Sequence, residues 1–141
     1  MFKLYELSSI KTVFYYLKKI GDEKNFIRAN KDLLDRAVQN LIKNSIEAIG
    51  LRTGKVDVAL KVIDGAISLT VVDNGPGVPE NLLSKITMKG SSFFKDKGTG
   101  LGLYQIKIAV EAMNGELTIK NIEPSGLFVE IKLPRVQKEK V

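Results

Sequence analysis

Residues 98–103 read Gly98-Thr99-Gly100-Leu101-Gly102-Leu103, with three glycines on alternate positions that lead into a helical pattern of apolar residues. Glycine has no Cβ, so such a backbone can bring its N–H groups close to an anion. A helix that begins there adds partial positive charge at its N-terminus. The same pattern also occurs in plain turns. Taken alone, the stretch leaves a phosphate-binding site and an ordinary turn both open.

Two common phosphate-binding motifs do not fit this stretch. A P-loop requires Gly-x-x-x-x-Gly-Lys-Ser/Thr, which the chain lacks, and a Rossmann motif requires a strong strand directly before its first glycine. Residues 87–97 instead mix serines, phenylalanines and lysines, including Lys95 and Lys97, without a helical or strand period. Lysines on such a loop are usually just solvated, but a mobile loop that ends in a phosphate-binding turn can close over a nucleotide as a lid.

The composition indicates one soluble domain and excludes several kinds of site. With 141 residues, 44% of them hydrophobic, the chain is long enough for one core and too short for two ordinary domains. No apolar run approaches the roughly 20 residues of a membrane span. The chain has no cysteine and no histidine, which excludes a thiolate metal site and a histidine general base, metal ligand or phosphoacceptor within it.

The charge distribution does not favour nucleic-acid binding. Lys and Arg total 22 against 16 for Asp and Glu, a formal net charge of +6, but they scatter along the chain without a basic run. A modest positive field suits an anionic small ligand such as a nucleotide or an acidic protein, and it is equally ordinary for solubility. The lack of cysteine is compatible with a reducing cytoplasm.

The order of the expected elements indicates an α+β fold. Apolar spacing predicts helices over 8–20, 31–49 and 101–113 and a short helix that begins near 79; alternation predicts strands over 25–30, 56–62, 67–71, 116–121 and 127–133. Strands and helices do not alternate as in βαβ units, which disfavours a doubly wound fold. We expect a single domain over 1–141, a two-layer sandwich of a mixed, mostly antiparallel sheet with helices on one face. Its ordered core spans about 8–134, with a lid at 87–97 and a charged tail at 135–141.

The helix expected over 31–49 carries polar residues beside its apolar stripe. Asn40, Asn44 and Glu47 lie at i, i+4 and i+7 and therefore share a face. Asparagine is unfavourable in the middle of a helix, so two in register suggest the polar wall of a cavity, while a solvated face is the other interpretation. An amide oxygen can complete the oxygen shell of Mg²⁺, which takes its other ligands from water and substrate phosphates.

An acidic residue and two glycines follow a buried strand in Val71-Val72-Asp73-Asn74-Gly75-Pro76-Gly77. Asn-Gly at this place is also a hairpin signal, but a helix start follows instead of a returning strand. The Asp73 carboxylate at the strand end can accept a hydrogen bond from a base edge such as the exocyclic amine of adenine. Gly75 and Gly77 free the backbone to approach a flat ligand.

The chain carries its motifs in a definite order: the asparagine pair at 40 and 44, the acidic strand end with two glycines at 73–77, the loop at 87–97 and the glycine stretch 98–103. In this order they closely resemble the ATP-binding catalytic domain of sensor histidine kinases, which belongs to the Bergerat-fold superfamily. The resemblance covers about residues 8–134. It implies binding of ATP with Mg²⁺ and transfer of the γ-phosphoryl group to a histidine on a separate phosphoacceptor helical hairpin, in two-component signalling through a response regulator. It also implies a cytoplasmic domain, monomeric in isolation, that contacts neither nucleic acid nor membrane, within a parent protein that can be membrane-anchored.

The resemblance implies a role for each motif. Asn44 looks like the Mg²⁺ ligand, Asp73 like the acceptor of the adenine amine, Gly75 and Gly77 like the residues that shape the adenine pocket, and residues 98–103 like the phosphate-binding stretch. The nucleotide-binding residues expected on this basis are Asn40, Lys43, Asn44, Asp73, Gly75, Gly77, Lys95, Lys97, Gly98, Thr99, Gly100, Leu101, Gly102 and Leu103.

Asn40 favours one branch of the superfamily. The ATPases of the superfamily resemble one another in a glutamate at this position, four residues before the metal-binding asparagine, where it activates water. An amide cannot accept that proton, which favours phosphotransfer over hydrolysis and assigns no general acid or base in this chain. The alternatives are an anti-sigma-factor-type serine kinase, which usually keeps the glutamate, and a non-catalytic ATP-binding regulatory module.

Three departures from the family pattern concern the lid and the pocket. Gly90-Ser91-Ser92 stands where a phenylalanine-containing box is expected, Glu47 replaces a frequent lysine as in nitrogen-regulation-like kinases, and Phe128 stands where a hydroxyl residue is frequent. Because the chain has no histidine and begins where the acceptor hairpin would end, we expect an excised domain that is separated from its acceptor.

Overall fold

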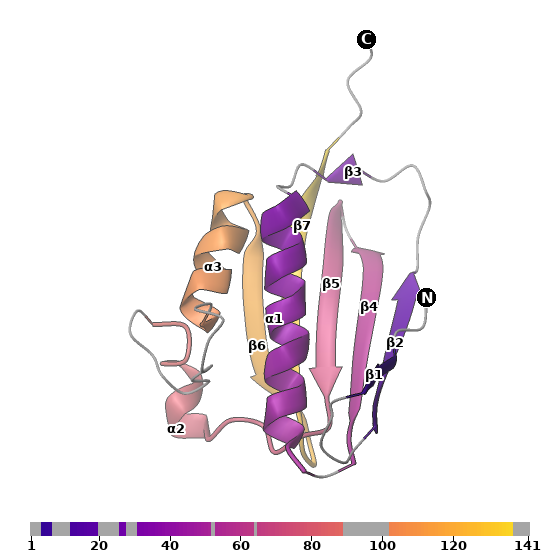
Figure 1. The fold of residues 1–141 in the computed structure, drawn as a ribbon. Helices are drawn as coiled ribbons and strands as arrows, with labels where there is room; N and C mark the ends of the chain where they lie inside the picture. Colours follow the sequence, from indigo (N-terminus) through magenta and orange to yellow (C-terminus); the bar gives the residue numbers. More distant parts are fainter. Residues whose placement is uncertain are drawn as a thin grey trace.

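A mixed sheet forms one layer of the molecule, and the helices cover one of its faces (Figure 1). The computed structural model describes residues 4–6, 12–19, 26–27, 31–51, 53–63, 65–88 and 102–136. Within these residues the strands are β1 (Leu4–Glu6), β2 (Thr12–Lys19), β3 (Phe26–Ile27), β4 (Lys55–Ile63), β5 (Ala66–Asp73), β6 (Glu116–Asn121) and β7 (Leu127–Val136). The helices are α1 (Lys31–Ile49), α2 (Glu80–Leu83) and α3 (Leu103–Ala112).

The sheet has the mostly antiparallel character expected from the sequence. Its strands follow the order β1-β2-β4-β5-β7-β3, with β6 paired to β7 off this path. The β2–β4 pair is parallel, whereas the other described pairs are antiparallel. The chain therefore has the predicted α+β class, with a sheet on one side and helices on the other.

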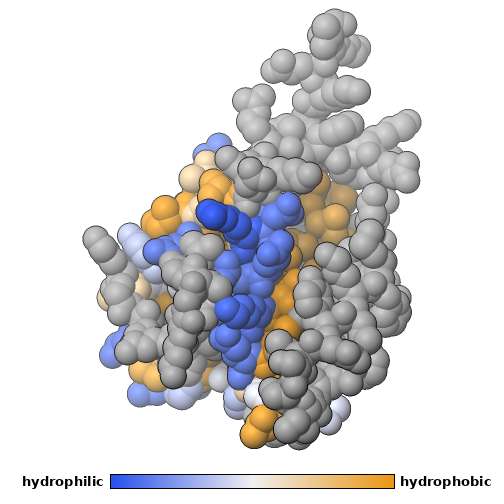
Figure 2. All heavy atoms as spheres, viewed as in Figure 1, coloured by the Kyte–Doolittle hydropathy of each residue, from blue (hydrophilic) through white to orange (hydrophobic). Residues whose placement is uncertain are grey.

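The core lies between the sheet and the two longer helices. The inward residues of β7, such as Val129 and Ile131, are buried against α1 and α3, where Ile106 and Val110 are almost completely enclosed. Burying each such side chain contributes about 1.5–3 kcal/mol relative to exposure. The outward face of α1 is hydrophilic and forms a band with hydrophobic surface along one side (Figure 2). Packing of its apolar stripe thus fixes which side of α1 faces the sheet.

The helix predicted over 8–20 is wrong, because the structure has strand β2 at Thr12–Lys19. The apolar residues there do fall at helical spacing, but the run Val13-Phe14-Tyr15-Tyr16 is β-branched and aromatic, the composition that favours strands. Strand β2 also pairs with β4, with Tyr15 opposite Val56. Ladder hydrogen bonds to an existing strand therefore decide the conformation against the helical periodicity.

The other boundaries lie within a few residues of the predictions. Helix α1 has the predicted bounds, β3 occupies part of the strand expected over 25–30, and α3 begins at Leu103. The start predicted for the charged tail, residue 135, is too early, because β7 continues to Val136 and pairs there with β3. Residues 89–101, which include most of the expected lid, lie outside the described residues. None of the helices in the described residues has the length and apolar character needed to span a membrane.

Replacement of Gly126 by alanine is expected to destabilise the domain by about 3 kcal/mol. Gly126 has φ of 137°, and a Cβ there would lie 2.2 Å from the carbonyl oxygen of Asp73. Gly65→Ala is the matched control, since Gly65 has φ of 74° and a Cβ there would meet nothing within 4 Å. Strain alone should cost Gly65→Ala about 1 kcal/mol. Urea unfolding of both variants measures the difference, and equal losses would contradict the steric argument.

Candidate functional site

A pocket opens between α1, the end of β5, the start of α3 and strand β7. Including its open mouth, it holds about 240 Å³ of space not filled by atoms. Its lining residues are Leu41, Asn44, Ser45, Asp73, Leu103, Leu127 and Val129. The pocket combines an apolar wall with a carboxylate, an amide and a hydroxyl, which is the usual make-up of a small-molecule site.

Asp73, the last residue of β5, places a carboxylate in this pocket and is only 4% exposed. Its Oδ1 accepts the N–H of Gly75 at 2.9 Å and that of Leu127 at 3.3 Å. Burial raises the pKa of the Asp73 carboxyl, while these bonds and one from the Ser45 hydroxyl act in the opposite direction. Because Oδ1 takes both backbone donors, the carboxylate has a fixed orientation.

The two asparagines of α1 are both buried, so the solvated-face interpretation does not hold for them. Asn44 is 6% exposed and lines the pocket, and its Nδ2 has no hydrogen-bond partner among the described residues. Asn40 is 8% exposed, and its Nδ2 donates to the carbonyl of Arg36 at 2.8 Å. The Nδ2 of Asn40 thus has a partner within its own helix, whereas the Nδ2 of Asn44 has none among the described residues. Buried polar groups are nearly always hydrogen-bonded, so Asn44 is suited to a polar ligand or water.

Lys43, another predicted residue of α1, does not line the pocket. Lys43 is half exposed, and its ammonium lies 3.9 Å from the carboxylate of Glu47 one turn along the helix. An exposed pair of this kind contributes little to stability. A contact of Lys43 with a nucleotide therefore stays a prediction.

The packing of the loop requires glycine at position 77 and leaves little room for a side chain at Gly75. A Cβ at Gly75 would lie 3.1 Å from Asp73 Oδ1. Gly77 has φ of 72°, and a Cβ there would lie 2.7 Å from Asn121 Oδ1. The sequence argument assigned both glycines to the approach of a ligand. The structure adds that each avoids a side chain that orients the loop.

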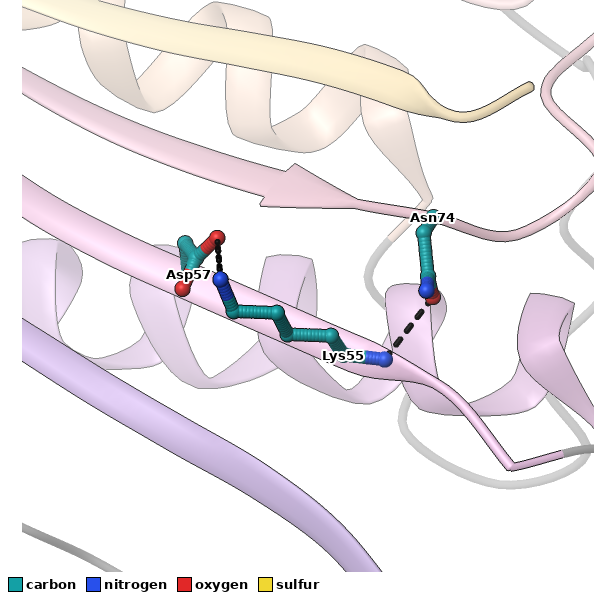
Figure 3. A network of polar contacts seen from close by, with 3 residues as sticks. All are labelled: Lys55, Asp57 and Asn74. Atoms are coloured by element: carbon teal, nitrogen blue, oxygen red, sulfur yellow. Dashed lines mark hydrogen bonds and ion pairs between the residues drawn. The ribbon is translucent and has the colours of Figure 1, made fainter. Parts of the chain in front are cut away.

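Asn74 ties the loop to the start of β4 (Figure 3). Its Oδ1 accepts the N–H of Lys55 at 2.8 Å, and its own N–H donates to the carbonyl of Lys55 at 3.2 Å. The Lys55 ammonium in turn lies 3.1 Å from the carboxylate of Asp57. Asn74 was not among the predicted site residues. Its place between Asp73 and Gly75 suggested only a turn, because the β4 partner lies 19 positions away.

The start of α3 reaches the pocket through Leu103. Gly102 is the N-cap, and its carbonyl accepts the N–H groups of Gln105 and Ile106 at 3.0 and 3.2 Å. Gly102 makes no side-chain cap, so the first N–H groups of the helix depend on water or a ligand. Six predicted residues lie outside the described residues: Lys95, Lys97, Gly98, Thr99, Gly100 and Leu101.

A divalent cation would not be held here by protein carboxylates alone. In the part of the chain that the structure describes, no three His, Cys, Asp or Glu side chains form a cluster able to hold a metal ion. The donor chemistry instead fits Mg²⁺ carried by a phosphate ligand, because that ion keeps several waters and takes few ligands from protein. Asn44 lines the pocket, and the oxygen of its side-chain amide is the kind of neutral ligand that could complete such a shell.

Comparisons with known proteins agree on one family. A family model described as "Histidine kinase-, DNA gyrase B-, and HSP90-like ATPase" matches residues 29–137. An NtrY-like sensor histidine kinase of Rickettsia conorii is 39% identical over 100 residues, which are 70% of this chain and 16% of that protein. The chain therefore spans about one sixth of the length of this curated relative.

Solved structures show the same fold. The mycobacterial sensor histidine kinase MprB superposes with a TM-score of 0.72 at 26% identity, over 89% of this chain and 84% of that one. The histidine kinase ThkA, solved in complex with the response regulator protein TrrA, superposes with a TM-score of 0.69 at 25% identity, over 88% of this chain and 34% of that one.

Proposed function

The chain belongs to the family of histidine kinase-, DNA gyrase B- and HSP90-like ATPases, and we propose that it is the catalytic domain of a protein-histidine kinase. It binds ATP with Mg²⁺ and transfers the γ-phosphoryl group to a histidine on a separate helical hairpin. Since the chain itself has no histidine, the acceptor belongs to another segment or another chain.

The observation that carries this proposal is the meeting of two buried polar groups in one pocket. Asp73 and Asn44 come from different elements, are 4% and 6% exposed, and line the same space beside the start of α3. The carboxylate suits the amine of adenine, the amide oxygen suits Mg²⁺, and the helix start suits phosphate. These three partners are joined in Mg·ATP.

Each group of the pocket has a definite task in this proposal. Leu127 and Val129 supply an apolar wall for the base, and Asp73 accepts a hydrogen bond from its exocyclic amine. The N-terminus of α3, with Leu103 at the pocket wall, orients the phosphates. Asn44 would hold Mg²⁺, which when bound neutralises charge on the phosphates. Further phosphate contacts are proposed for Lys95, Lys97 and residues 98–101.

The transfer itself requires positioning more than acid or base chemistry. A nitrogen of the acceptor imidazole attacks the γ-phosphorus in line; the N–P bond forms as the bond to the bridging oxygen breaks, and ADP leaves. Asn40 stands where hydrolytic relatives are expected to carry a glutamate, and its amide cannot take a proton from water. The absence of a carboxylate at this position of α1 favours transfer to imidazole over hydrolysis.

The wider setting follows from the same proposal. The phosphoryl group passes from the acceptor histidine to a response regulator, as the complex of ThkA with TrrA suggests. The domain works in the cytoplasm as part of a parent kinase that can be membrane-anchored, and the isolated domain is monomeric.

The test is phosphotransfer from γ-labelled Mg·ATP to the acceptor hairpin of the parent kinase. Acid-labile, base-stable label on the hairpin is the expected result, because phosphohistidine hydrolyses in acid. Acid-stable label on serine of a small protein substrate would indicate an anti-sigma-factor-type kinase instead. ATP binding without any transfer would indicate a regulatory module.

A further inference from the structure

Asn121, the last residue of β6, joins two parts of the chain that lie far apart in sequence. Its Oδ1 accepts the N–H of Val78 at 2.8 Å, and its Nδ2 donates to the carbonyl of Val78 at 2.6 Å. The same Nδ2 donates to Oε1 of Glu80 at 3.0 Å. Both amide hydrogens and the amide oxygen are therefore used within the protein.

These bonds hold the loop that follows Asp73. Val78 is 4% exposed and directly follows Gly77. A Cβ at Gly77 would lie 2.7 Å from Asn121 Oδ1, so the glycine leaves room for the Asn121 side chain. The neighbouring turn adds a second tie, because the Ser125 hydroxyl donates to the carbonyl of Gly75. The loop is thus anchored from the end of β6 as well as from Asn74 on the side of β4.

We propose that Asn121 is a positioning residue for the nucleotide pocket, which sets the place of residues 75–78 relative to Asp73 without touching the ligand. The proposal rests on the proposed function, since it takes this loop to be the one that receives the base. It follows from the contacts: the amide has no hydrogen left for a ligand, and its partners are the backbone of Val78 and the first residue of α2.

Asn121→Asp is the informative variant, because it keeps the shape of the side chain and replaces its hydrogen-bond donor, Nδ2, with an acceptor oxygen. An oxygen then replaces Nδ2 and faces two acceptors, the carbonyl of Val78 and the carboxylate of Glu80. Repulsion at both contacts should displace the loop. We expect the Kd for ATP to rise by about tenfold or more, because small misplacements at a binding site have effects of this order.

The matched control is Asn114→Asp, which makes the same change of charge. Asn114 is exposed in the turn after α3 and has φ of 58°, a conformation that aspartate also tolerates. Rescue comes from Glu80→Gln in the Asn121→Asp background, because the glutamine amide can donate to the new carboxylate. We expect the control to bind ATP like the wild type and the double variant to recover part of the lost affinity, because the contact with residue 80 is restored and the one with the Val78 carbonyl is not.

The experiment is calorimetric titration of ATP and GTP into each protein at a temperature where urea unfolding shows all of them folded. A positioning role predicts that the preference for ATP, expressed as the Kd for GTP divided by the Kd for ATP, falls in Asn121→Asp and returns in the double variant. Hydrogen exchange without nucleotide should show faster exchange at the Val78 amide in Asn121→Asp.

Two outcomes would overturn the proposal. If Asn121→Asp lowers the free energy of unfolding but changes neither the Kd for ATP nor the preference for ATP over GTP, Asn121 is a purely structural residue. Failure of the wild-type protein to bind ATP at all would instead refute the proposed function, and the positioning proposal with it.

Discussion

Asp73→Asn is expected to weaken ATP binding by about 100-fold or more, an estimate based on the loss of a charged hydrogen bond and the burial of an unmatched donor. Asp73 Oδ1 accepts the N–H groups of Gly75 and Leu127. In the variant, the amide oxygen keeps these two donors, so the NH₂ group takes the other place. An NH₂ group there faces the amine of adenine donor to donor.

Asp57→Asn is the control for this variant. Asp57 lies on β4 and pairs with Lys55 outside the pocket, so its loss of charge should leave the Kd for ATP unchanged. The measurement is calorimetric titration with Mg·ATP. Equal affinities of Asp73→Asn and the wild type would remove Asp73 from the adenine contact.

Asp73→Asn should make the nucleotide-free protein more stable at pH 7, although it weakens ATP binding. Burial raises the pKa of Asp73 above its ordinary 3.8, so the ionised carboxylate opposes folding at pH 7. That penalty is absent below pH 3.8, where the carboxyl is protonated in both the folded and the unfolded protein. It grows between pH 3.8 and the raised pKa and is complete above the raised pKa. Urea unfolding without nucleotide should therefore find Asp73→Asn more stable than the wild type at pH 7, with a gap that closes as pH falls. A gap independent of pH would contradict the assignment.

Asn44→Ala is expected to lower phosphotransfer by about 100-fold or more, an effect typical for the loss of one group that stabilises transferred charge. The wild-type protein should bind ATP more tightly with Mg²⁺ than with EDTA, and the variant should lose that difference. Its fold should change little, because the Asn44 Nδ2 is buried without a partner among the described residues and its removal abandons no hydrogen bond there.

Gln39→Ala is the matched control for the loss of an amide from α1. Gln39 is exposed on the same helix, and its removal should affect neither transfer nor the Mg²⁺ dependence of binding. If Asn44→Ala keeps the full Mg²⁺ dependence, the metal is held by other groups and the assignment of Asn44 is wrong.

Local signals were sufficient wherever one element carries its own pattern. The apolar stripe of α1 predicted the helix with its observed bounds, and the alternation over 56–62 and 67–71 predicted the strands β4 and β5. The same signals failed at Thr12–Lys19, where apolar spacing fits a helix and a strand forms. The decisive interaction there is pairing with β4, a partner far along the chain.

The amino-acid sequence by itself determined the α+β class, the place of Asp73 at a strand end and the common face of Asn40 and Asn44, because each depends on residues a few positions apart. Only the tertiary structure decided that Asn44 and Asp73 line one pocket while Asn40 does not. It also decided that Asn121 holds Val78 across 43 positions. The reason is physical: burial and hydrogen bonding between distant segments depend on how the chain packs, and no local periodicity encodes them.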